Sequence, residues 1–414
     1  MSESLLMQEK TPYARVEPPC PYFGTCGGCS LQDLAYPDQL ALKRERLRSA
    51  FAALGDVLAF DVVGLEEPWR YRNKAELTFS MSDGRLILGY HARRSFWRVV
   101  GLEDCLLLPE PAMAAARDVL ALAAETGLPA YHPRTHQGFF RYLLVRSSHS
   151  TGRLLLCLMT APETAIEDVA EQGRVRALIE RMAQVIIARH PLVASVSWGI
   201  TGRLADVAVP EELRLLAGTA HFEDQIGPFR LRLHPLSFLQ PSSAQADRIY
   251  ARLGEWLGDA PEGIVWDLYC GVGLVGLYLA KRFRKVYGID VEPQHIELAA
   301  LNASLNGLDN IECRAGRVET VLMDRRFWLQ EAKPEAIVVD PPRAGLHASA
   351  LSSIMAARPR RIAYLSCNAQ SFARDAQVLR TGFPRYRLAQ VAAFDMFPQT
   401  DHVETLAILE RGER

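Results

Sequence analysis

The chain of 414 residues has a formal net charge of −1, and 49% of its residues are hydrophobic and 23% charged. This length predicts two or three domains, and the composition is typical of a globular enzyme. The near-zero net charge excludes a histone-like, tail-driven nucleic-acid binder, although it is compatible with a local basic face. Because no signal-peptide core and no run of about 18 apolar residues occurs, we expect a cytoplasmic protein without membrane spans.

The N-terminal part is predicted to be a loose tail over residues 1–19, followed by a knot of clustered cysteines. Cys20, Cys26 and Cys29 form a C-x5-C-x2-C pattern, and the glycines between them suit a backbone wrapped around a metal centre. In a chain without an export signal, such clustering indicates metal or cluster binding before disulfides. Cys105 is the candidate fourth ligand. Four thiolates suit zinc or an iron–sulfur cluster, and the spacing does not choose between them.

A basic helix over residues 38–53 precedes a region of short alternating strands between about 70 and 235. Helical stretches near 110–125 and 166–189 interrupt these strands, which predicts an α+β domain with an antiparallel sheet over 70–235. Residues 20–110 are expected to hold the cysteine knot and the first basic strands.

Arginines and aromatic side chains are interleaved in this α+β domain, and this pattern predicts contacts with RNA. Cations hold phosphates, and aromatic rings stack on unpaired bases. The alternative interpretation is a plain solvated face of the strands. The residues concerned are Trp69, Arg70, Tyr71, Arg72, Lys74, Arg93, Arg94, Phe96, Trp97, Arg98, Arg134, Arg141, Arg146 and Arg153.

The pattern changes after His234, where short apolar segments begin to alternate with helical sequence. Over residues 236–414 this alternation predicts a doubly wound, Rossmann-like parallel sheet that closes with a C-terminal hairpin. Ligands of such sheets bind beyond the carboxyl ends of the strands. The residues that carry chemistry are predicted at these ends, namely the stretch from Asp267 to Gly273, then Asp290, Asp340 and Cys367.

Two of these strand ends indicate a nucleotide-type ligand. Gly271, Gly273 and Gly276 form G-x-G-x-x-G between a strand and a helix, and Asp290 follows about 20 residues later, where a carboxylate can accept ribose hydroxyls. NAD and S-adenosylmethionine sites share this geometry, and tight-turn glycines are the plain alternative. Asp340 opens "DPPRAG", and Asp-Pro-Pro at this place is typical of methyltransferases that act on nucleobases.

Cys367 ends the strand "RIAYLS" and precedes "NAQSFARD", which has the features of a helix start. The positive helix end is expected to lower the pKa of the thiol and to raise its thiolate fraction. A buried cysteine that only fills space is the alternative.

Several motifs resemble the RNA uracil-5-methyltransferases, which make 5-methyluridine in ribosomal and transfer RNA. They are the cysteine knot, "YRNKAEL", "LSFLQPSSAQ", "DPPRAG", "SCNAQSFARD" and "FDMFPQTDHVE", in order from Cys20 to Glu404. The resemblance implies S-adenosylmethionine as methyl donor and a [4Fe–4S] cluster on Cys20, Cys26, Cys29 and Cys105. It also implies a nucleophile at Cys367, a general base at Glu404, and cofactor contacts from Gln240, Tyr269, Asp290 and Asp340.

The chemistry explains why this family needs a thiol and a carboxylate. Carbon 5 of uracil becomes nucleophilic once a thiolate has added to carbon 6, and the proton on carbon 5 must then be removed by a base. Without the resemblance, Gln240 is more simply a helix cap, Tyr269 a core residue and Glu404 a strand-edge carboxylate.

The resemblance also suggests a branch of the family. Only 19 residues precede Cys20, so the N-terminal β-barrel of some relatives is expected to be absent. Ala369 stands where most relatives have proline, which matches the short 23S ribosomal RNA enzymes, although that branch often has Asn in place of Asp340. We therefore expect a monomeric enzyme for 23S ribosomal RNA. The alternatives are transfer RNA as substrate, or a non-catalytic iron–sulfur RNA-binding protein.

Overall fold

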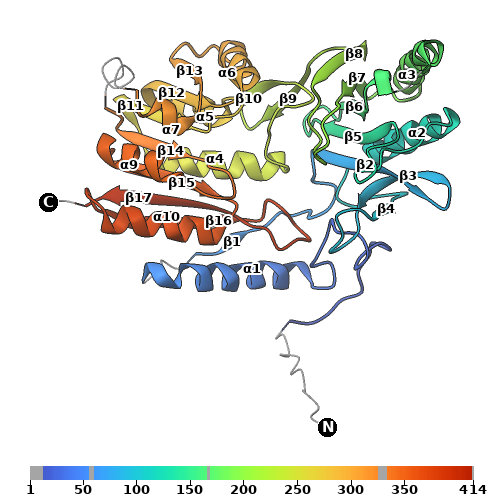
Figure 1. The fold of residues 1–414 in the computed structure, drawn as a ribbon. Coiled ribbons are helices and arrows are strands. Elements are labelled where there is room, and N and C mark those ends of the chain that lie inside the picture. Colours follow the sequence, from blue (N-terminus) through green and yellow to red (C-terminus); the bar gives the residue numbers. More distant parts are fainter. Residues whose placement is uncertain (1–12, 56–59, 166–167, 325–332, 413–414) are drawn as a thin grey trace, which may run out of the picture.

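The computed structural model describes residues 13–55, 60–165, 168–324 and 333–412, so most of the predicted tail lies outside the described residues. Figure 1 shows two β-sheets side by side, with α1 (Tyr36–Phe51) running below the left-hand one. Among the described residues, no helix combines the length and the apolar character that crossing a membrane requires.

The left-hand sheet has eight strands in the order β1-β16-β17-β15-β14-β11-β12-β13. β11 to β15 are parallel, and β16 and β17 form the antiparallel C-terminal hairpin, as the sequence predicts. The strands are β1 (Val62–Val63), β11 (Ala260–Leu268), β12 (Phe283–Asp290), β13 (Ile311–Ala315), β14 (Ala336–Val339), β15 (Arg361–Ser366), β16 (Tyr386–Phe394) and β17 (Glu404–Arg411). The described helices of this half are α4 (Ser243–Leu257), α5 (Leu274–Ala280), α6 (Pro293–Leu305), α7 (Val318–Val321), α9 (Ala348–Ala357) and α10 (Ala369–Thr381).

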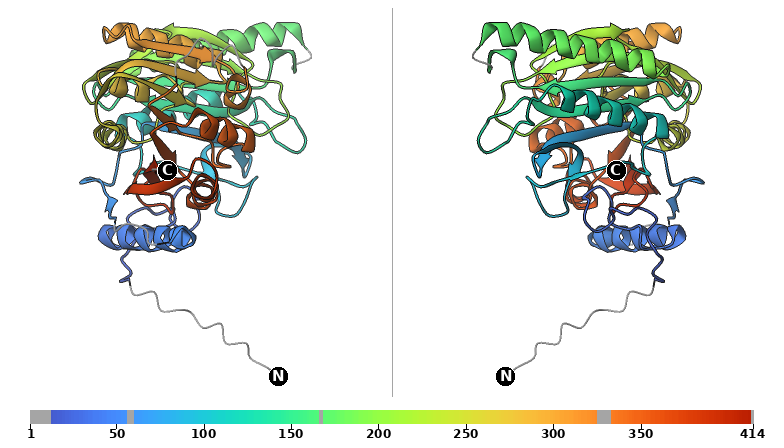
Figure 2. Two further views of the ribbon diagram at one scale, coloured as in Figure 1. Left: turned by 90° about the vertical axis from the view of Figure 1, so that its left-hand side faces the viewer. Right: turned by 90° about the vertical axis from the view of Figure 1, so that its right-hand side faces the viewer.

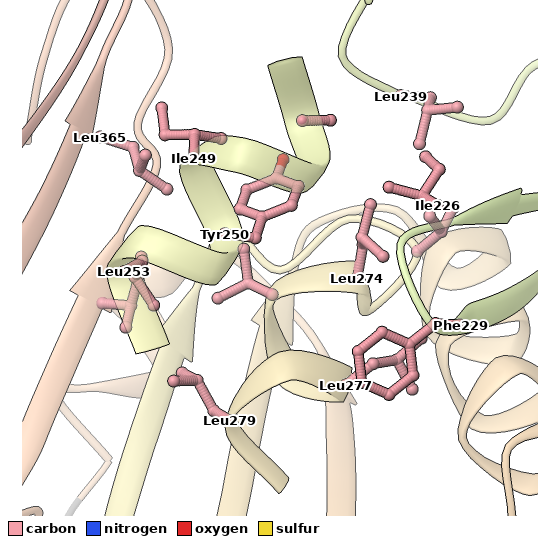
Figure 3. Packing of buried hydrophobic residues seen from close by; sticks show 14 of the residues in the cluster. Ile226, Phe229, Leu239, Ile249, Tyr250, Leu253, Leu274, Leu277, Leu279 and Leu365 are labelled. Carbon is pink, nitrogen blue, oxygen red and sulfur yellow. The ribbon is translucent and has the colours of Figure 1, made fainter. Parts of the chain in front are cut away.

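Helices cover both faces of this sheet, which gives it the Rossmann-like architecture. On one face, Ile249, Tyr250 and Leu253 of α4 pack against Leu274 and Leu277 of α5, as Figure 3 shows. The three α4 residues lie on one stripe because they are one, three and four positions apart. Each fully buried aliphatic or aromatic side chain of this kind contributes about 1.5–3 kcal/mol. The other face is covered by α1, α9 and α10.

The N-terminal part of the chain crosses over to this sheet, which the predicted domain ranges did not anticipate. Val62 of β1 pairs with Ala393 of β16 in parallel. Phe51 at the end of α1 packs on Phe372 of α10, with the two ring centroids 5.3 Å apart. The short 3₁₀ helix η1 (Ala52–Leu54) follows α1. α1 and β1 therefore complete the half of the molecule that is built on the eight-stranded sheet.

A buried ion pair fixes α1 to the loop between β16 and β17. Lys43 Nζ lies 2.5 Å from Asp395 Oδ1 and donates to the carbonyl of Phe397 at 3.1 Å, and both charged side chains are 0% exposed. We expect Lys43→Met to lower the free energy of unfolding by about 3–5 kcal/mol, because Asp395 would stay buried without its partner. Chemical denaturation measures this loss.

Arg44 provides the matched control one residue further along α1. Its ion pair with Asp61 is solvent-exposed, with side chains 39% and 84% accessible. Arg44→Ala is expected to cost about 1 kcal/mol or less. Equal losses for the Lys43 and Arg44 variants would contradict the structural role of the buried pair.

The right-hand sheet has seven strands in the order β4-β3-β2-β5-β6-β7-β8. They are β2 (Lys74–Ser82), β3 (Arg85–His91), β4 (Val99–Gly101), β5 (Phe140–Ser147), β6 (Leu154–Thr160), β7 (Val193–Ile200) and β8 (Glu212–Gly218). The predicted antiparallel pairing is right except for β6 and β7, which are parallel. The reason is that α3 (Val169–Arg189) links them as a crossover helix, which brings the second strand back in the same direction. The short 3₁₀ helix η2 (Glu163–Ala165) precedes it.

α2 (Glu110–Glu125) and α3 cover the outer side of this sheet, away from the eight-stranded one (Figure 2). Between the two halves lies a separate hairpin, β9 (Phe222–Ile226) and β10 (Phe229–Leu233). It packs into the core of the eight-stranded half, although the predicted range 70–235 placed it with the other domain. The backbone N–H of Arg232 donates to the side-chain oxygen of Asn302 in α6 at 2.7 Å, and that of Arg230 to the side-chain oxygen of Asn306, directly after α6, at 3.0 Å.

Candidate functional site

The parallel register aligns the ends of β11, β12 and β14 at one edge of the eight-stranded sheet. Tyr269, Asp290 and Asp340 therefore lie next to one another, although they are far apart in the sequence. Tyr269 has a φ of 67°, a left-handed conformation that a residue with a side chain rarely adopts. Strain of this kind is concentrated at functional sites, because the surrounding structure has to hold it in place.

The antiparallel register of β15 and β17 brings Cys367 and Glu404 together. Ser366 and Thr405 are paired, and the Thr405 hydroxyl donates to the Ser366 carbonyl at 3.1 Å. The next position on each strand is Cys367 on one side and Glu404 on the other. The two predicted catalytic residues are therefore neighbours across the sheet.

A single cavity of about 1500 Å³ between the two sheets contains all six residues that the sequence predicts as catalytic or cofactor-binding. It is large enough for a nucleoside cofactor and an unstacked base together. Besides Gln240, Tyr269, Asp290, Asp340, Cys367 and Glu404, its lining includes Arg72, Lys74, Tyr90, Phe238, His295, Glu319, Arg343 and Phe397.

Asp290 is held by three donors around its carboxylate. The backbone N–H groups of Gly271 and Glu292 donate at 2.9 and 3.0 Å, and His295 Nδ1 lies at 3.0 Å. Burial alone would raise the pKa of Asp290, but these hydrogen bonds outweigh it and lower the pKa. A carboxylate that stays charged and fixed beside a glycine turn can accept ligand hydroxyls. A Cβ on Gly271 would meet nothing within 4 Å, so the space above this turn is open.

Asp340 and Glu404 form a pair of interacting carboxyl groups inside the cavity. Burial raises the pKa of Asp340, and a hydrogen bond with the Gln240 side chain only partly opposes this. Burial, then the neighbouring Asp340, raises the pKa of Glu404 well above its usual range, and Arg343 partly opposes the rise. A carboxylate with a raised pKa accepts a proton more readily, as a general base requires.

The predicted lowering of the Cys367 pKa is wrong for the protein without substrate. Burial first, and then the carboxylate of Glu404, raise the pKa of Cys367, whereas Arg343 lowers it. The start of α10 gives little help, because the Asn368 side chain accepts from the backbone N–H groups of Gln370 and Ser371. These two N–H groups at the start of the helix therefore donate to the capping side chain of Asn368 rather than to the thiol.

Arg343 is therefore expected to set the reactivity of the thiol. Because it is the cation that lowers the Cys367 pKa, Arg343→Gln should raise that pKa further and slow alkylation by iodoacetamide a few-fold at pH 8. In the wild type the alkylation rate should rise with pH through the raised pKa, as the thiolate forms. Mass spectrometry of the Cys367 peptide measures both effects, and an unchanged rate in Arg343→Gln would contradict this role.

Sequence reasoning missed three residues that shape the site. Asn73 donates to the Gln240 carbonyl at 2.8 Å and to Ser243 Oγ at 3.0 Å, which ties β2 to the turn before α4. Phe238, two residues before Gln240, is 54% exposed on the cavity wall. Arg343 is linked to the Cys367 loop, because Asn368 Nδ2 donates to its carbonyl at 3.0 Å. Each lies within a motif quoted above, but only spatial proximity reveals its role.

The four cysteines of the predicted knot line a second, small cavity next to the first. Burial first, and then the other three cysteines, raise the pKa of Cys29 to about 12, although a hydrogen bond with Gln32 opposes this. Among the described residues, no group of three or more His, Cys, Asp or Glu side chains has the geometry to hold one metal ion. Tyr90 lines both cavities, so the cysteines lie directly behind the wall of the larger one.

Two of the predicted RNA contacts are wrong, because the side chains are buried, and a third arginine is held in an ion pair. Arg141 and Arg146 are each only 2% exposed, and their side chains donate to backbone carbonyls, Arg146 Nε to Pro235 at 2.6 Å. Arg70 forms a two-pronged ion pair with Asp104 and also donates to the Cys105 carbonyl. Strand alternation predicts two faces, but it cannot show that the second face is covered by loops and by the neighbouring half.

The fold matches a solved structure over most of the chain. The Pyrococcus abyssi tRNA (uracil-54, C5)-methyltransferase in complex with S-adenosyl-L-homocysteine is similar with a TM-score of 0.72 and 27% identity. The match covers 92% of this chain and 85% of that one. Together with the glycine turn and Asp290, it defines the class: this is an S-adenosylmethionine-dependent methyltransferase with a Rossmann-like fold.

The sequence comparisons define the family. The model of the tRNA (uracil-5-)-methyltransferase family matches residues 225–412. An uncharacterized RNA methyltransferase of Halalkalibacterium halodurans is 34% identical over 399 residues, 96% of this chain and 84% of that protein. One from Caldanaerobacter subterraneus is 34% identical over 410 residues, covering 98% and 87% of the two proteins. The chain belongs to the RNA uracil-5-methyltransferase family, and its substrate is RNA.

Proposed function

We propose that this enzyme methylates carbon 5 of a specific uridine in 23S ribosomal RNA, with Cys367 as nucleophile and Glu404 as general base. The observation that carries the proposal is the pairing of β15 with β17, which sets a thiol opposite a carboxylate of raised pKa in the cavity that also holds Asp290 and Asp340. Methylation at an amine needs neither group, whereas methylation at carbon 5 of uracil needs both.

The proposed reaction follows from these two side chains. The Cys367 thiolate adds to carbon 6 of uracil and forms a C–S bond, which leaves an enolate with electron density on carbon 5. When bound, S-adenosylmethionine supplies the methyl group that carbon 5 takes up, and the broken sulfur–methyl bond leaves S-adenosylhomocysteine as the second product. Glu404 then accepts the proton from carbon 5, and the C–S bond breaks, which restores the aromatic ring and the thiolate.

The remaining predicted residues are proposed to hold the methyl donor. Asp290 can accept hydrogen bonds from ribose hydroxyls, since its charge is maintained by His295 and two backbone donors. Gln240 and Asp340, which hydrogen-bond to each other, and Tyr269 line the neighbouring wall. Phe238 offers an exposed aromatic face on which the target base could stack.

The choice of RNA rests on different observations for the two candidates. The motif "SCNAQ", with Ala369 after the nucleophile, resembles the short 23S enzymes. The family model and the solved neighbour, by contrast, are both described by transfer RNA, which makes transfer RNA the second candidate.

Labelled-methyl transfer onto unmodified 23S ribosomal RNA and onto unmodified transfer RNA, followed by mapping of the modified base, tests the proposal. A single 5-methyluridine in 23S RNA is the expected result, and one in transfer RNA would establish the second candidate. The absence of transfer to both would leave the non-catalytic alternative.

We also propose that Cys20, Cys26, Cys29 and Cys105 hold a [4Fe–4S] cluster with a structural role. Four cysteine thiols surround one small cavity, and four thiolates are the ligands that such a cluster takes. Because each thiolate binds a different iron, the four sulfur atoms need not be close enough to hold a single metal ion. The cluster takes no part in the methyl transfer. Anaerobically purified protein should contain about four irons per chain, by the definition of such a cluster. Stoichiometric zinc without iron would refute the assignment.

A further inference from the structure

The loop between β3 and β4, residues 92–98, exposes two large aromatic side chains side by side. Phe96 is 81% exposed and Trp97 is 57% exposed, and their ring centroids are 6.4 Å apart. Single exposed apolar residues are common, but two adjacent aromatic rings left in water mark an interaction site.

Cations surround these rings. Arg134, which comes from the segment before β5, places its guanidinium 4.2 Å from the centre of the Trp97 ring. Arg93, Arg94 and Arg98 belong to the loop itself and are exposed, as is Arg134. Within the part of the chain that the structure describes, no ion pair includes any of these four arginines, and His91 just before the loop pairs with Asp206 instead. The loop and Arg134 together are called the aromatic–arginine surface below.

The base of the loop is rigidly held although its tip is exposed. Ala92 N–H donates to the Arg98 carbonyl at 2.7 Å and closes the loop. The cysteine segment fixes it from the other side, because Arg93 N–H donates to the Thr25 carbonyl at 2.8 Å and Gly27 N–H to the His91 carbonyl at 2.9 Å. A loop held in this way loses little conformational entropy when it binds a ligand.

The surface begins directly after β3, a strand that also lines the active-site cavity. Tyr90, two residues before the loop, lines that cavity, and so does Lys74 at the start of the adjacent strand β2. The six residue-to-residue steps from Tyr90 to Phe96 span at most about 22 Å. A nucleic-acid strand that enters the cavity therefore passes close to the exposed rings.

We propose that the aromatic–arginine surface binds an unpaired nucleotide of the substrate RNA that flanks the target uridine. Its base stacks on Phe96 or Trp97, and the arginines hold the adjoining phosphates. The inference rests on the proposed function, because it takes the RNA in the cavity as its starting point. Exposed aromatic rings next to arginines without ion-pair partners can bind single-stranded RNA with little sequence preference. In a duplex the bases are already stacked on one another and cannot stack on these rings.

The test measures binding directly and needs no turnover. A fluorescein-labelled, uridine-containing single-stranded RNA of 20 nucleotides, and its duplex with the complementary strand, are titrated with the full-length protein at fixed salt. Phe96→Ala/Trp97→Ala is expected to weaken binding of the single strand about 5- to 150-fold and to change binding of the duplex little. Arg134→Gln should also lower the slope of log affinity against log salt by about one.

Phe383→Ala provides the matched control. Phe383 is 77% exposed and carries Arg358 5.1 Å from its ring centre, so it repeats the pairing of an exposed ring with an arginine in a different part of the chain. This variant should bind the single strand like the wild type. Unchanged S-adenosylhomocysteine binding by calorimetry shows that the double variant is folded.

The outcomes separate this inference from the proposed function. If the folded double variant bound the single strand as tightly as the wild type, the proposed RNA contact of this surface would be wrong. A protein partner would then be the remaining candidate for it. A loss of affinity equal for the duplex and the single strand would also overturn the proposed contact, since stacking cannot explain such a loss. Failure of the proposed function appears elsewhere, as absence of labelled-methyl transfer by the wild type.

Discussion

Cys367→Ala should abolish methyl transfer to RNA, with a loss of at least about 10³-fold in rate. The reason is that carbon 5 of uracil gains nucleophilic character only after carbon 6 has been attacked, and the structure presents this thiol opposite Glu404 in the cavity. S-adenosylhomocysteine binding should remain, because the glycine turn and Asp290 lie on other strands. Labelled-methyl transfer and calorimetry measure the two properties separately.

A mechanism-based probe distinguishes a nucleophile from a residue that only packs. RNA with 5-fluorouridine at the mapped position should form a covalent complex with the wild type, because fluorine on carbon 5 cannot leave as a proton does. Cys367→Ala should form none on a denaturing gel. Cys313→Ala, which removes a partly buried cysteine outside the cavity, should form it like the wild type. Turnover by Cys367→Ala at the wild-type rate would rule out covalent catalysis.

Glu404→Gln should slow turnover about 10²- to 10⁴-fold, the range for loss of a general base. It should also trap the enzyme on ordinary RNA, since the C–S bond cannot break until the proton on carbon 5 has been removed. The expected product is a denaturant-stable complex whose RNA already carries the labelled methyl group. A gel of the reaction with unmodified RNA shows whether it accumulates.

Glu76→Gln is the control for a carboxylate in the same cavity. Glu76 is exposed, lines the same cavity and pairs with Lys74 at 2.6 Å. It should trap no complex. If Glu404→Gln slows the reaction without accumulating the methylated complex, another group removes the proton.

The acid side of the pH–rate profile follows from the titration of Glu404. Burial and Asp340 raise the pKa of Glu404, so its base form is lost as the pH falls through that raised value rather than through the usual range for glutamate. Asp340 titrates with it, so the profile reports the pair rather than either carboxyl group alone.

The sequence by itself determined the local features of the site. The G-x-G-x-x-G turn, Asp290 and Asp340 each follow an apolar strand, and strand, turn and helix start are encoded within a few neighbouring residues. Their common edge then follows from the rule that parallel strands end on one side. The change of pattern after His234 likewise marked the start of the alternating helices and parallel strands, and the last two strands were identifiable as a hairpin.

Only the tertiary structure decided which distant residues meet and what environment they share. The β15–β17 register set Glu404 against Cys367, and that carboxylate together with burial reversed the expected pKa shift of the thiol. Arg141 and Arg146, interpreted from the basic and aromatic pattern of this domain as RNA contacts, are buried. α1 packs against the eight-stranded half, where the buried Lys43–Asp395 pair fixes it. Burial, register and electrostatic neighbours depend on residues far away in the chain, so no local pattern can specify them.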